Sequence, residues 1–416
     1  MSEAERIRNR RAIEALRAGV PNRDAVLALG STQPKIEEKF REQLHSVEAR
    51  PQGLLVQGGF GAGKSHLLEF LLQTALRENY VCSKVVISKE TPFYDPAKLY
   101  RAAAEAAVVP RRMGDALTEI MTKMDTDSQA YADFDQWVNR SPDLSQMFAA
   151  TLFIYKRMPG AYNGEVRNRI IRFWSGEKIG SAEIRRWLRT CGERVTFNIT
   201  RIATKEIALQ RFKFTARLMV AAGYAGWILF IDELELIRCY SLRQRAKSYA
   251  ELARWMGKLE DWQSTGLTTV ASIIDIFASE VLEGKNDLEK VPGKLRVQGS
   301  TDDLLLASQA EQGMRIIEGE GTELVSPDSS MLQAIYAKVK SIYADAYDCS
   351  PPDVTGLGIL EPTTMRHHVK SWITEWDLKR KDPNYESIIE TKAGELEMGY
   401  LEDKDLQVSP EGENEA

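Results

Sequence analysis

The feature that most constrains this chain is a glycine-rich run at Gly58–Ser65 that matches the pattern GxxxxGK[ST] letter for letter. An apolar segment at 53–57 precedes the run, and a helical pattern of apolar residues at 65–78 follows it. A strand, a glycine-rich turn and a helix in this order gather backbone N–H groups and a helix N-terminus at one point, where they bind phosphate. The run therefore predicts an α/β fold with a phosphate-binding loop (P-loop) at the end of a parallel strand.

Further apolar segments predict the other strands of this sheet. Besides 53–57, we expect strands at 81–88, 227–231 and 267–274, with a candidate fifth strand at 294–297. The intervening residues follow helical patterns, which indicates a parallel sheet covered by helices.

The spacing of these segments divides the chain into four predicted parts. We expect N-terminal helices over 1–50 and a P-loop core over 51–300, in which residues 97–222 form a long helical insertion. A helical lid is predicted over 301–380. The last segment, 381–416, carries eleven acidic residues against three lysines, and this composition predicts a solvated, flexible tail.

The chemistry of the predicted loop follows from its residue types. Glycines allow backbone N–H groups to curl around a triphosphate without a Cβ atom in the way. The Lys64 ammonium group would neutralise the β and γ phosphates, and the Ser65 hydroxyl group is a hard oxygen ligand for Mg²⁺. We predict that ATP and Mg²⁺ bind here, and that the ATP-binding residues of this segment are Gly58, Gly59, Phe60, Gly61, Ala62, Gly63, Lys64, Ser65 and His66.

The predicted strand 227–231 runs directly into the acidic pair Asp232-Glu233. Asp232 is expected to bind Mg²⁺ together with the serine hydroxyl group, and Glu233 to act as general base on a water molecule in line with the γ-phosphate. Glu233 and Lys64 are therefore the predicted catalytic residues. Glu235 is also acidic, but it stands two positions further on and is expected to have left the strand tip. Because only one other strand is evident between the loop and this pair, we also expect a strand to separate the two in the sheet.

Together with three flanking segments, these motifs resemble the ATP-binding proteins of bacterial BREX phage-exclusion systems, the BrxC/BrxD type. The resemblance runs over most of residues 5–380, and the chain is closest in size to the small BREX ATPase. It implies an AAA+-like core, similar to that of origin-recognition and helicase-loader ATPases. The segments that carry it are 13–23, 58–65, 223–226, 232–235 and 363–366.

The resemblance also implies roles for residues outside the two motifs. Val20 and Pro21 would lie in a turn beside the adenine, and Arg366 in the lid would respond to the γ-phosphate. After the fourth strand, only Ser272 or Asp275 could sense the γ-phosphate, because the Gly-Thr-Pro turn that is usual there is missing.

The charge pattern bears on possible partners. Residues 165–217 carry thirteen Lys or Arg against five Glu, interleaved with Phe173, Trp174 and Trp187. Such a stretch suits nucleic acid, with arginines on phosphates and aromatic rings on bases. In the alternative interpretation the aromatic residues are core, and the arginines form a solvated or partner-facing surface.

The composition narrows the cellular setting. No apolar segment is long enough to span a bilayer, and the charged N-terminus is unlike a secretory signal. The four cysteines are scattered and form no CxxC pair, which fits a reducing cytoplasm. We therefore expect a cytoplasmic protein without a membrane partner.

Three functions remain open. The first is an ATPase whose nucleotide cycle assembles, loads or remodels a DNA-acting partner of the helicase, methyltransferase or nuclease type in phage defence. The second is a nucleotide-gated scaffold that barely hydrolyses ATP, and the third is a replication or transposition loader. Double-stranded DNA is a candidate partner. We also expect an ATP-dependent homo-oligomer, in which Arg243 or Arg245 is a candidate arginine finger.

Overall fold

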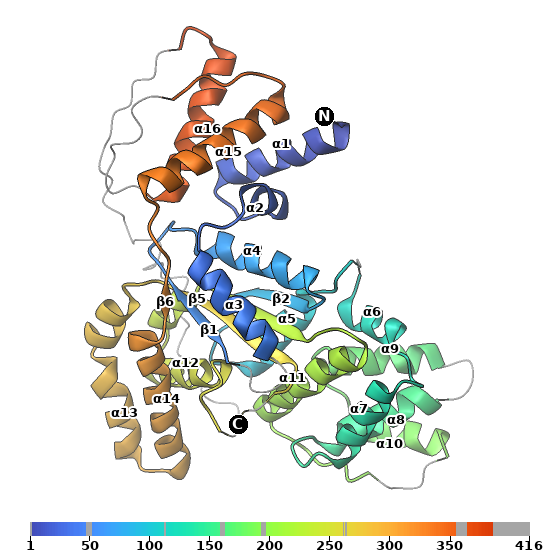
Figure 1. The fold of residues 1–416 in the computed structure, drawn as a ribbon. Helices are drawn as coiled ribbons and strands as arrows, with labels where there is room; N and C mark the ends of the chain where they lie inside the picture. The colour runs from blue at the N-terminus through green and yellow to red at the C-terminus, as the bar shows by residue number, and fades with distance from the viewer. Residues whose placement is uncertain are drawn as a thin grey trace.

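The computed structural model is an α/β fold built on one central sheet, with helices on both of its faces (Figure 1). The α/β class and the mostly parallel sheet predicted from the sequence are confirmed. None of the helices described is both long enough and apolar enough to cross a membrane. The structure describes residues 2–46, 52–111, 114–158, 163–192, 197–260, 262, 264–354 and 364–385.

The sheet consists of β1 (Leu54–Gln57), β2 (Val81–Val86), β3 (Ala107–Val108), β4 (Trp227–Asp232), β5 (Leu267–Ile273) and β6 (Thr322–Glu323). Their order is β3-β2-β4-β5-β1-β6, and neighbouring strands are parallel except for β2 and β3. Strand β5 lies between β1 and β4, which confirms that a strand separates the strand of the glycine-rich loop from the acidic strand.

The predicted fifth strand at 294–297 is wrong, because these residues belong to helix α13 (Asp287–Gln298). Polar and apolar residues alternate over the four positions, as in a strand, but so short a window also fits one helical turn with a single buried residue. Leu295 is that residue, at 2% exposed, whereas Val297 is 88% exposed. The two strands that the sequence did not predict, β3 and β6, are only two residues long, too short for an alternating pattern.

Two apolar layers cover the faces of the sheet. Val56, Phe230 and Val270 point into the first layer, whereas Leu55, Leu229 and Ala271 point into the second, because strand side chains alternate. Parallel strands end at the same edge, so the loop after β1 and the acidic residues after β4 meet there. The first layer contains α3 (Pro34–Ser46) and α4 (Lys64–Arg77), and the second contains α5 (Pro96–Glu105), α11 (Thr204–Ala221) and α12 (Leu242–Trp255).

The chain between β2 and β4 is mostly helical, and its aromatic core continues into the second layer. Phe214 of α11 packs against Phe148 and Trp174, with ring centroids 4.9 and 5.2 Å apart, and Tyr100 of α5 donates to the carbonyl group of Trp174. These helices therefore share one core with the sheet. Between α5 and α11 they are α6 (Ala116–Lys123), α7 (Gln129–Arg140), α8 (Gln146–Arg157), α9 (Asn163–Trp174) and α10 (Ser181–Thr190).

Four helices from the two ends of the chain form a cluster of their own, at the top of Figure 1. Arg17 binds Asp377 with two hydrogen bonds of 2.9 and 3.1 Å, which fasten the first helix to the last. We call this unit the terminal helix cluster. It consists of α1 (Glu3–Ala18), α2 (Arg23–Leu29), α15 (Ser329–Tyr347) and α16 (Met365–Lys381).

The packing of α14 (Thr301–Gly319) differs from what a lid over 301–380 implies. This helix packs against α12 and α13, beside the sheet, and not in the terminal helix cluster. The cluster instead pairs α15 and α16 with α1 and α2. Most of the predicted tail, residues 386–416, lies outside the described residues.

Candidate functional site

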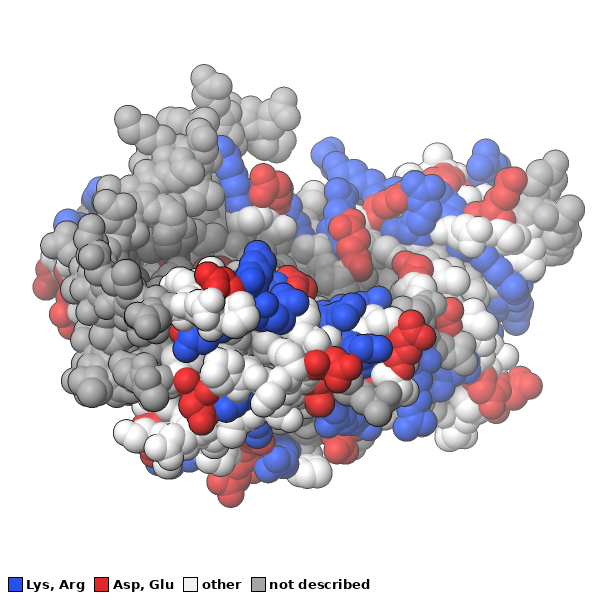
Figure 2. Space-filling model, turned by 90° about the horizontal axis from the view of Figure 1, so that it is seen from above, with Lys and Arg blue, Asp and Glu red and all other residues white. Residues whose placement is uncertain are grey.

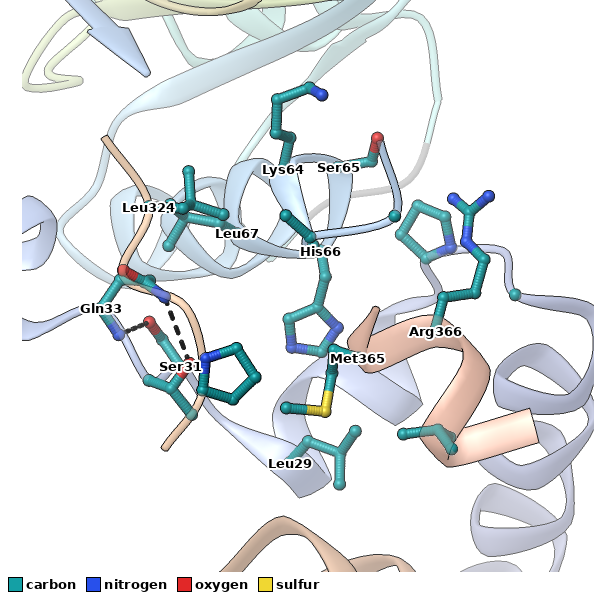
Figure 3. Close-up of a pocket in the computed structure, with 18 of the residues that line it drawn as sticks. Leu29, Ser31, Gln33, Lys64, Ser65, His66, Leu67, Leu324, Met365 and Arg366 are labelled. Atoms are coloured by element: carbon teal, nitrogen blue, oxygen red, sulfur yellow. Dashed lines mark hydrogen bonds between the residues drawn. The ribbon is translucent and has the colours of Figure 1, made fainter. Parts of the chain in front are cut away.

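A cleft lies between the glycine-rich loop and the terminal helix cluster, and it encloses about 1280 Å³, part of which is open to solvent. The loop and α4 form one wall, and residues of α1, α2, α15 and α16 form the other. Figure 3 shows Lys64 and Ser65 at one end of this space, and Leu29, His66 and Met365 at the other. The cleft thus has a polar end at the loop and a more apolar end among the helices, which suits a nucleoside triphosphate.

The backbone of the loop is shaped to hold an anion. Gly61 (φ 74°) and Gly63 (φ 104°) adopt left-handed conformations that residues with a side chain rarely take. A Cβ atom on Gly63 would meet no atom within 4 Å, so the space beside this residue is open. The backbone N–H groups of Gly61, Gly63 and Ser65 make no backbone hydrogen bond among the described residues. These donors and the N-terminus of α4 therefore provide a cradle for phosphate oxygens.

Lys64 is a buried cation of the site, at 8% exposed. Its Nζ atom donates to the carbonyl oxygens of Gly58 (2.8 Å) and Gly59 (3.3 Å). It also lies 3.8 Å from Oε1 of Glu235. The carbonyl groups of the loop and one carboxylate thus compensate the charge of this ammonium group.

Asp232, the last residue of β4, is held from two sides. Its Oδ1 atom accepts a hydrogen bond from the Ser272 hydroxyl group on β5 (2.5 Å), and its Oδ2 atom lies 3.8 Å from Nζ of Lys84 on β2. The same Nζ atom donates to the backbone carbonyl oxygen of Ser65 (3.3 Å). Lys84 therefore contacts both residues that were predicted to bind Mg²⁺.

The two candidate sensors of the γ-phosphate differ in position. Ser272 is fully buried within β5 and donates its hydroxyl hydrogen to Asp232, so it orients that carboxylate. Asp275 lies beyond the strand, where its Oδ2 atom is 3.5 Å from the place that a Cβ atom on Gly59 would take. Asp275 is therefore the candidate that lies beside the loop.

The acidic residues after β4 turn back toward the loop. Glu233 has a positive φ of 66° and begins the 3-10 helix Leu234–Cys239. This tight turn returns Glu235 to the vicinity of Lys64, where Glu235 is 2% exposed. Glu235 has left the strand, as expected, but the turn brings its side chain back to Lys64, so it belongs to the site after all.

Burial perturbs both glutamates. It raises the pKa of Glu233, with a further contribution from the neighbouring Asp232. It also raises the pKa of Glu235 to about 7, although Lys64 opposes this shift. The Oε2 atom of Glu235 is buried and makes no hydrogen bond among the described residues. The site thus contains a carboxyl group that exchanges its proton near neutral pH.

Glu235→Gln is expected to stabilise the protein more at about pH 8 than at about pH 5. In the folded protein this carboxyl group keeps its proton up to about pH 7, whereas in the unfolded chain it ionises near its ordinary pKa of 4.5. Raising the pH across this interval therefore destabilises the folded wild type, and the glutamine variant lacks this loss. Melting temperatures of both proteins at the two pH values test the expectation. A difference between variant and wild type that does not grow with pH would show that Lys64 keeps Glu235 ionised throughout.

The apolar end of the cleft is where the resemblance places the adenine. Val20 and Pro21, in the turn between α1 and α2, are among the residues that line the cleft. The imidazole ring of His66 points from α4 toward Met365, with Leu29 beyond it (Figure 3), and its Nε2 atom is 2.9 Å from the carbonyl oxygen of Gly30. Burial lowers the pKa of His66, so the ring is neutral at physiological pH and can pack against a base.

Arg366 connects the terminal helix cluster to the loop. Its guanidinium carbon lies 5.3 Å from the ring centroid of Phe60, a cation–π contact between the first turn of α16 and the loop. A Cβ atom on Gly61 would stand 2.9 Å from Oγ1 of Thr364, the residue that caps α16. Thr363 belongs to the segment 363–366, one of those that carry the resemblance, and it lies outside the described residues. The predicted position of Arg366 beside the nucleotide site is consistent with these contacts.

The two candidate arginine fingers are both held by carboxylates of their own chain. A terminal nitrogen of the Arg243 guanidinium group lies 2.8 Å from Oδ1 of Asp303. Arg245 makes two 2.7 Å hydrogen bonds to Asp287, which is fully buried and also accepts from Tyr249. In this structure Arg245 therefore supports the fold, which argues against its use as a finger for a neighbouring subunit.

The fold and the cleft first define a class: an α/β protein whose glycine-rich loop, buried lysine and acidic strand end form a site for a phosphate-bearing ligand. A family model described as BREX system ATP-binding protein BrxC/D matches residues 5–355. The chain therefore belongs to this family of ATP-binding proteins, as the resemblance indicated, and membership implies a role in a BREX defence system. Neither the curated proteins nor the solved structures contain a match to this chain.

Proposed function

We propose that this protein is a P-loop ATPase of the AAA+ type that binds ATP–Mg²⁺ in the cleft. One observation carries the proposal: two segments far apart in the chain converge at one edge of the sheet, so that Lys64 lies 3.8 Å from Glu235. The strand order supports it further, because β5 separates β1 from β4, as in the ATPase branch with an inserted strand. The direct test is isothermal titration of the protein with ATP in Mg²⁺, together with a turnover assay.

Each polar residue of the site has a role in this proposal. Lys64 would exchange the carbonyl groups of its loop for phosphate oxygens. Ser65 and Asp232 would hold Mg²⁺, which when bound neutralises charge on the β and γ phosphates. Glu233, whose raised pKa makes it a better proton acceptor, would orient and deprotonate the attacking water molecule.

Within the defence system, the nucleotide cycle would assemble, load or remodel a DNA-acting partner of the helicase, methyltransferase or nuclease type. The cleft supports this role because its two walls belong to different packing units, the sheet and the terminal helix cluster. A nucleotide that contacts both the loop and Arg366 would change how the two units pack. Such a change would alter the contact between Arg366 and Phe60, which joins the two units.

A nucleotide-gated scaffold with little hydrolysis is the second candidate function. Ser272 is buried against Asp232, so Asp275 is the one candidate sensor of the γ-phosphate that lies beside the loop. A site with fewer sensors favours a protein that binds ATP but hydrolyses little of it. Turnover measured with and without double-stranded DNA separates the two functions. Light scattering with and without ATP tests the ATP-dependent homo-oligomer that we propose for either of them.

The basic stretch 165–217 bears on a DNA partner. Phe173, Trp174 and Trp187 are buried, so the interpretation of the aromatic residues as core is confirmed. Arg169 and Arg172 are paired with glutamates. In contrast, three exposed arginines on α10 form no ion pair with a carboxylate among the described residues, and their uncompensated charge favours an anionic partner: Arg185, Arg186 and Arg189.

The terminal helix cluster has a surface of mixed charge on the side that Figure 2 shows. On this face Lys and Arg side chains lie interspersed with Asp and Glu side chains. Mixed charges of this kind give a weak field for a phosphate backbone. We place the proposed DNA contact on α10 because its three exposed arginines lie together on one short helix.

The protein is expected to bind a random-sequence DNA duplex, and its affinity should fall about tenfold or more between about 50 and 200 mM salt. Replacing Arg185, Arg186 and Arg189 with glutamate should abolish this binding, because repulsion replaces three phosphate contacts. Fluorescence anisotropy of a labelled duplex, with and without a slowly hydrolysed ATP analogue, measures both effects.

A triple variant with the same change in charge elsewhere is the matched control. Arg8, Arg11 and Arg41 are exposed on α1 and α3, and their replacement with glutamate should leave most of the duplex binding intact. Equal losses in the two triple variants would mean that net charge alone governs binding. No binding by the wild type at low salt, in either nucleotide state, would make α10 a surface for a protein partner.

A further inference from the structure

A lysine that belongs to neither sequence motif reaches the acidic edge of the sheet. Lys84 stands on β2 in register with Phe230 of β4, two residues before the position of Asp232. Strand side chains alternate, so Lys84 shares its face with Cys82 and Phe230, which belong to the apolar layer under α4. The aliphatic part of Lys84 therefore follows this layer, and its side chain is only 19% exposed.

The ammonium group of Lys84 contacts both residues that are predicted to hold Mg²⁺, Asp232 through its carboxylate and Ser65 through its backbone carbonyl group. Its Nζ atom is 3.8 Å from Oδ2 of Asp232 and 3.3 Å from the carbonyl oxygen of Ser65. Asp232 is the one carboxylate within 4 Å of Lys84 among the described residues. Because Ser272 already binds Oδ1, Oδ2 is the oxygen that a cation can still reach.

We propose that Lys84 is a built-in substitute for the divalent cation: its ammonium group neutralises Asp232 when the metal is absent and gives way when Mg²⁺ enters with the nucleotide. This inference rests on the proposed binding of ATP–Mg²⁺ in the cleft. It adds that the site also holds the nucleotide without metal, because Lys84 then supplies part of the positive charge that the phosphates need.

The proposal predicts a coupling between Lys84 and Mg²⁺. An ammonium ion and Mg²⁺ compete for the same carboxylate oxygen, so removing Lys84 should strengthen the binding of Mg²⁺ to the nucleotide complex. Removing Lys84 should also weaken nucleotide binding in EDTA, where the ammonium group is the substitute. Both effects change one quantity in the same direction, the ratio of the nucleotide dissociation constant in EDTA to that in Mg²⁺.

The experiment measures this ratio with a fluorescent, slowly hydrolysed ATP analogue, by anisotropy. Lys84→Met keeps the aliphatic stem and removes the charge, and the ratio should rise about tenfold over that of the wild type. Lys84→Arg keeps the charge, and its ratio should stay closer to that of the wild type. Lys98→Met, an exposed lysine on α5, is the matched control and should leave the ratio unchanged. Should Lys84→Met fail to fold, as judged by its thermal transition, Lys84→Gln replaces it.

The outcomes separate this inference from the proposed function. If Lys84→Met changes both dissociation constants by the same factor, or neither, then Lys84 does not stand in for the metal and the inference is overturned. If the wild type binds the analogue in neither condition, the proposed function fails, and this inference fails with it. A ratio that rises in Lys84→Met and in Lys98→Met alike would point to a general effect of charge and would also overturn it.

Discussion

Lys64→Ala is expected to weaken the binding of ATP–Mg²⁺ by about 10²-fold or more, without unfolding the protein. Lys64 is the only cationic side chain of the loop, and it is buried where water screens its charge poorly. The variant leaves Glu235 without its nearby ammonium group. Because burial already raises the pKa of Glu235 to about 7, this carboxyl group can take up a proton and avoid an unpaired buried charge. Isothermal titration with ATP in Mg²⁺ measures the affinity, and the thermal transition reports the fold.

Lys98→Ala is the matched control for this prediction. Lys98 is an exposed lysine on α5, so its loss removes the same group without touching the cleft. This variant should bind ATP as the wild type does. Wild-type affinity in Lys64→Ala would mean that the loop is not the nucleotide site, and the proposed ATPase would have to be abandoned.

The parts of the site that were predictable from the sequence are those whose residues are neighbours in the chain. The strand, the glycine-rich turn and the start of the helix follow one another directly at 54–65, so their structure follows from local pattern alone. The same holds for Asp232, because a buried strand that ends in an acid delivers that acid to the edge of the sheet. The separation of β1 from β4 in the sheet was also predictable, because only one strand is evident between the loop and the acidic pair in the sequence.

Two polar residues of the site were missed because tertiary structure places them there. The position of Glu235 is set by the positive φ of Glu233, which turns the chain into a 3-10 helix. The residue type at position 233 does not indicate this turn. Lys84 depends on the pairing of β2 with β4. Here the sequence did contain a signal: a lysine inside a mostly apolar strand needs a partner for its charge, and that partner is Asp232.

The wall of the cleft opposite the loop was only partly predictable. The turn at Val20 and Pro21 was expected beside the adenine from the resemblance, but not the packing of α1 against α15 and α16. That packing brings together residues more than 300 positions apart, such as Arg17 and Asp377, which have an ordinary helical pattern when read alone. An amphipathic pattern indicates that a helix packs against a partner, but it does not identify that partner.

Glu233→Gln is expected to keep the affinity for ATP and to lower its turnover by about 10²-fold or more. Glutamine has the size and hydrogen-bonding capacity of glutamate but cannot accept a proton from water. The raised pKa of Glu233 favours the role of base, because a carboxylate with its ordinary pKa would hold a proton taken from water less well. Phosphate release measured in steady state gives turnover, and titration with ATP gives affinity for the same protein preparation.

Glu235→Gln is the comparison that decides which carboxylate is the base. Glu235 lies 3.8 Å from Lys64, so its replacement should alter the position of that lysine and affect ATP affinity more than turnover. If Glu235→Gln loses turnover at unchanged affinity while Glu233→Gln stays active, the general base is Glu235, and the turn at Glu233 serves to aim it. Equal turnover in the wild type and both variants would remove both glutamates from the chemistry. A wild type without turnover, even with DNA present, would favour the scaffold, in which a buried carboxyl group near Lys64 holds the loop in place until ATP binds.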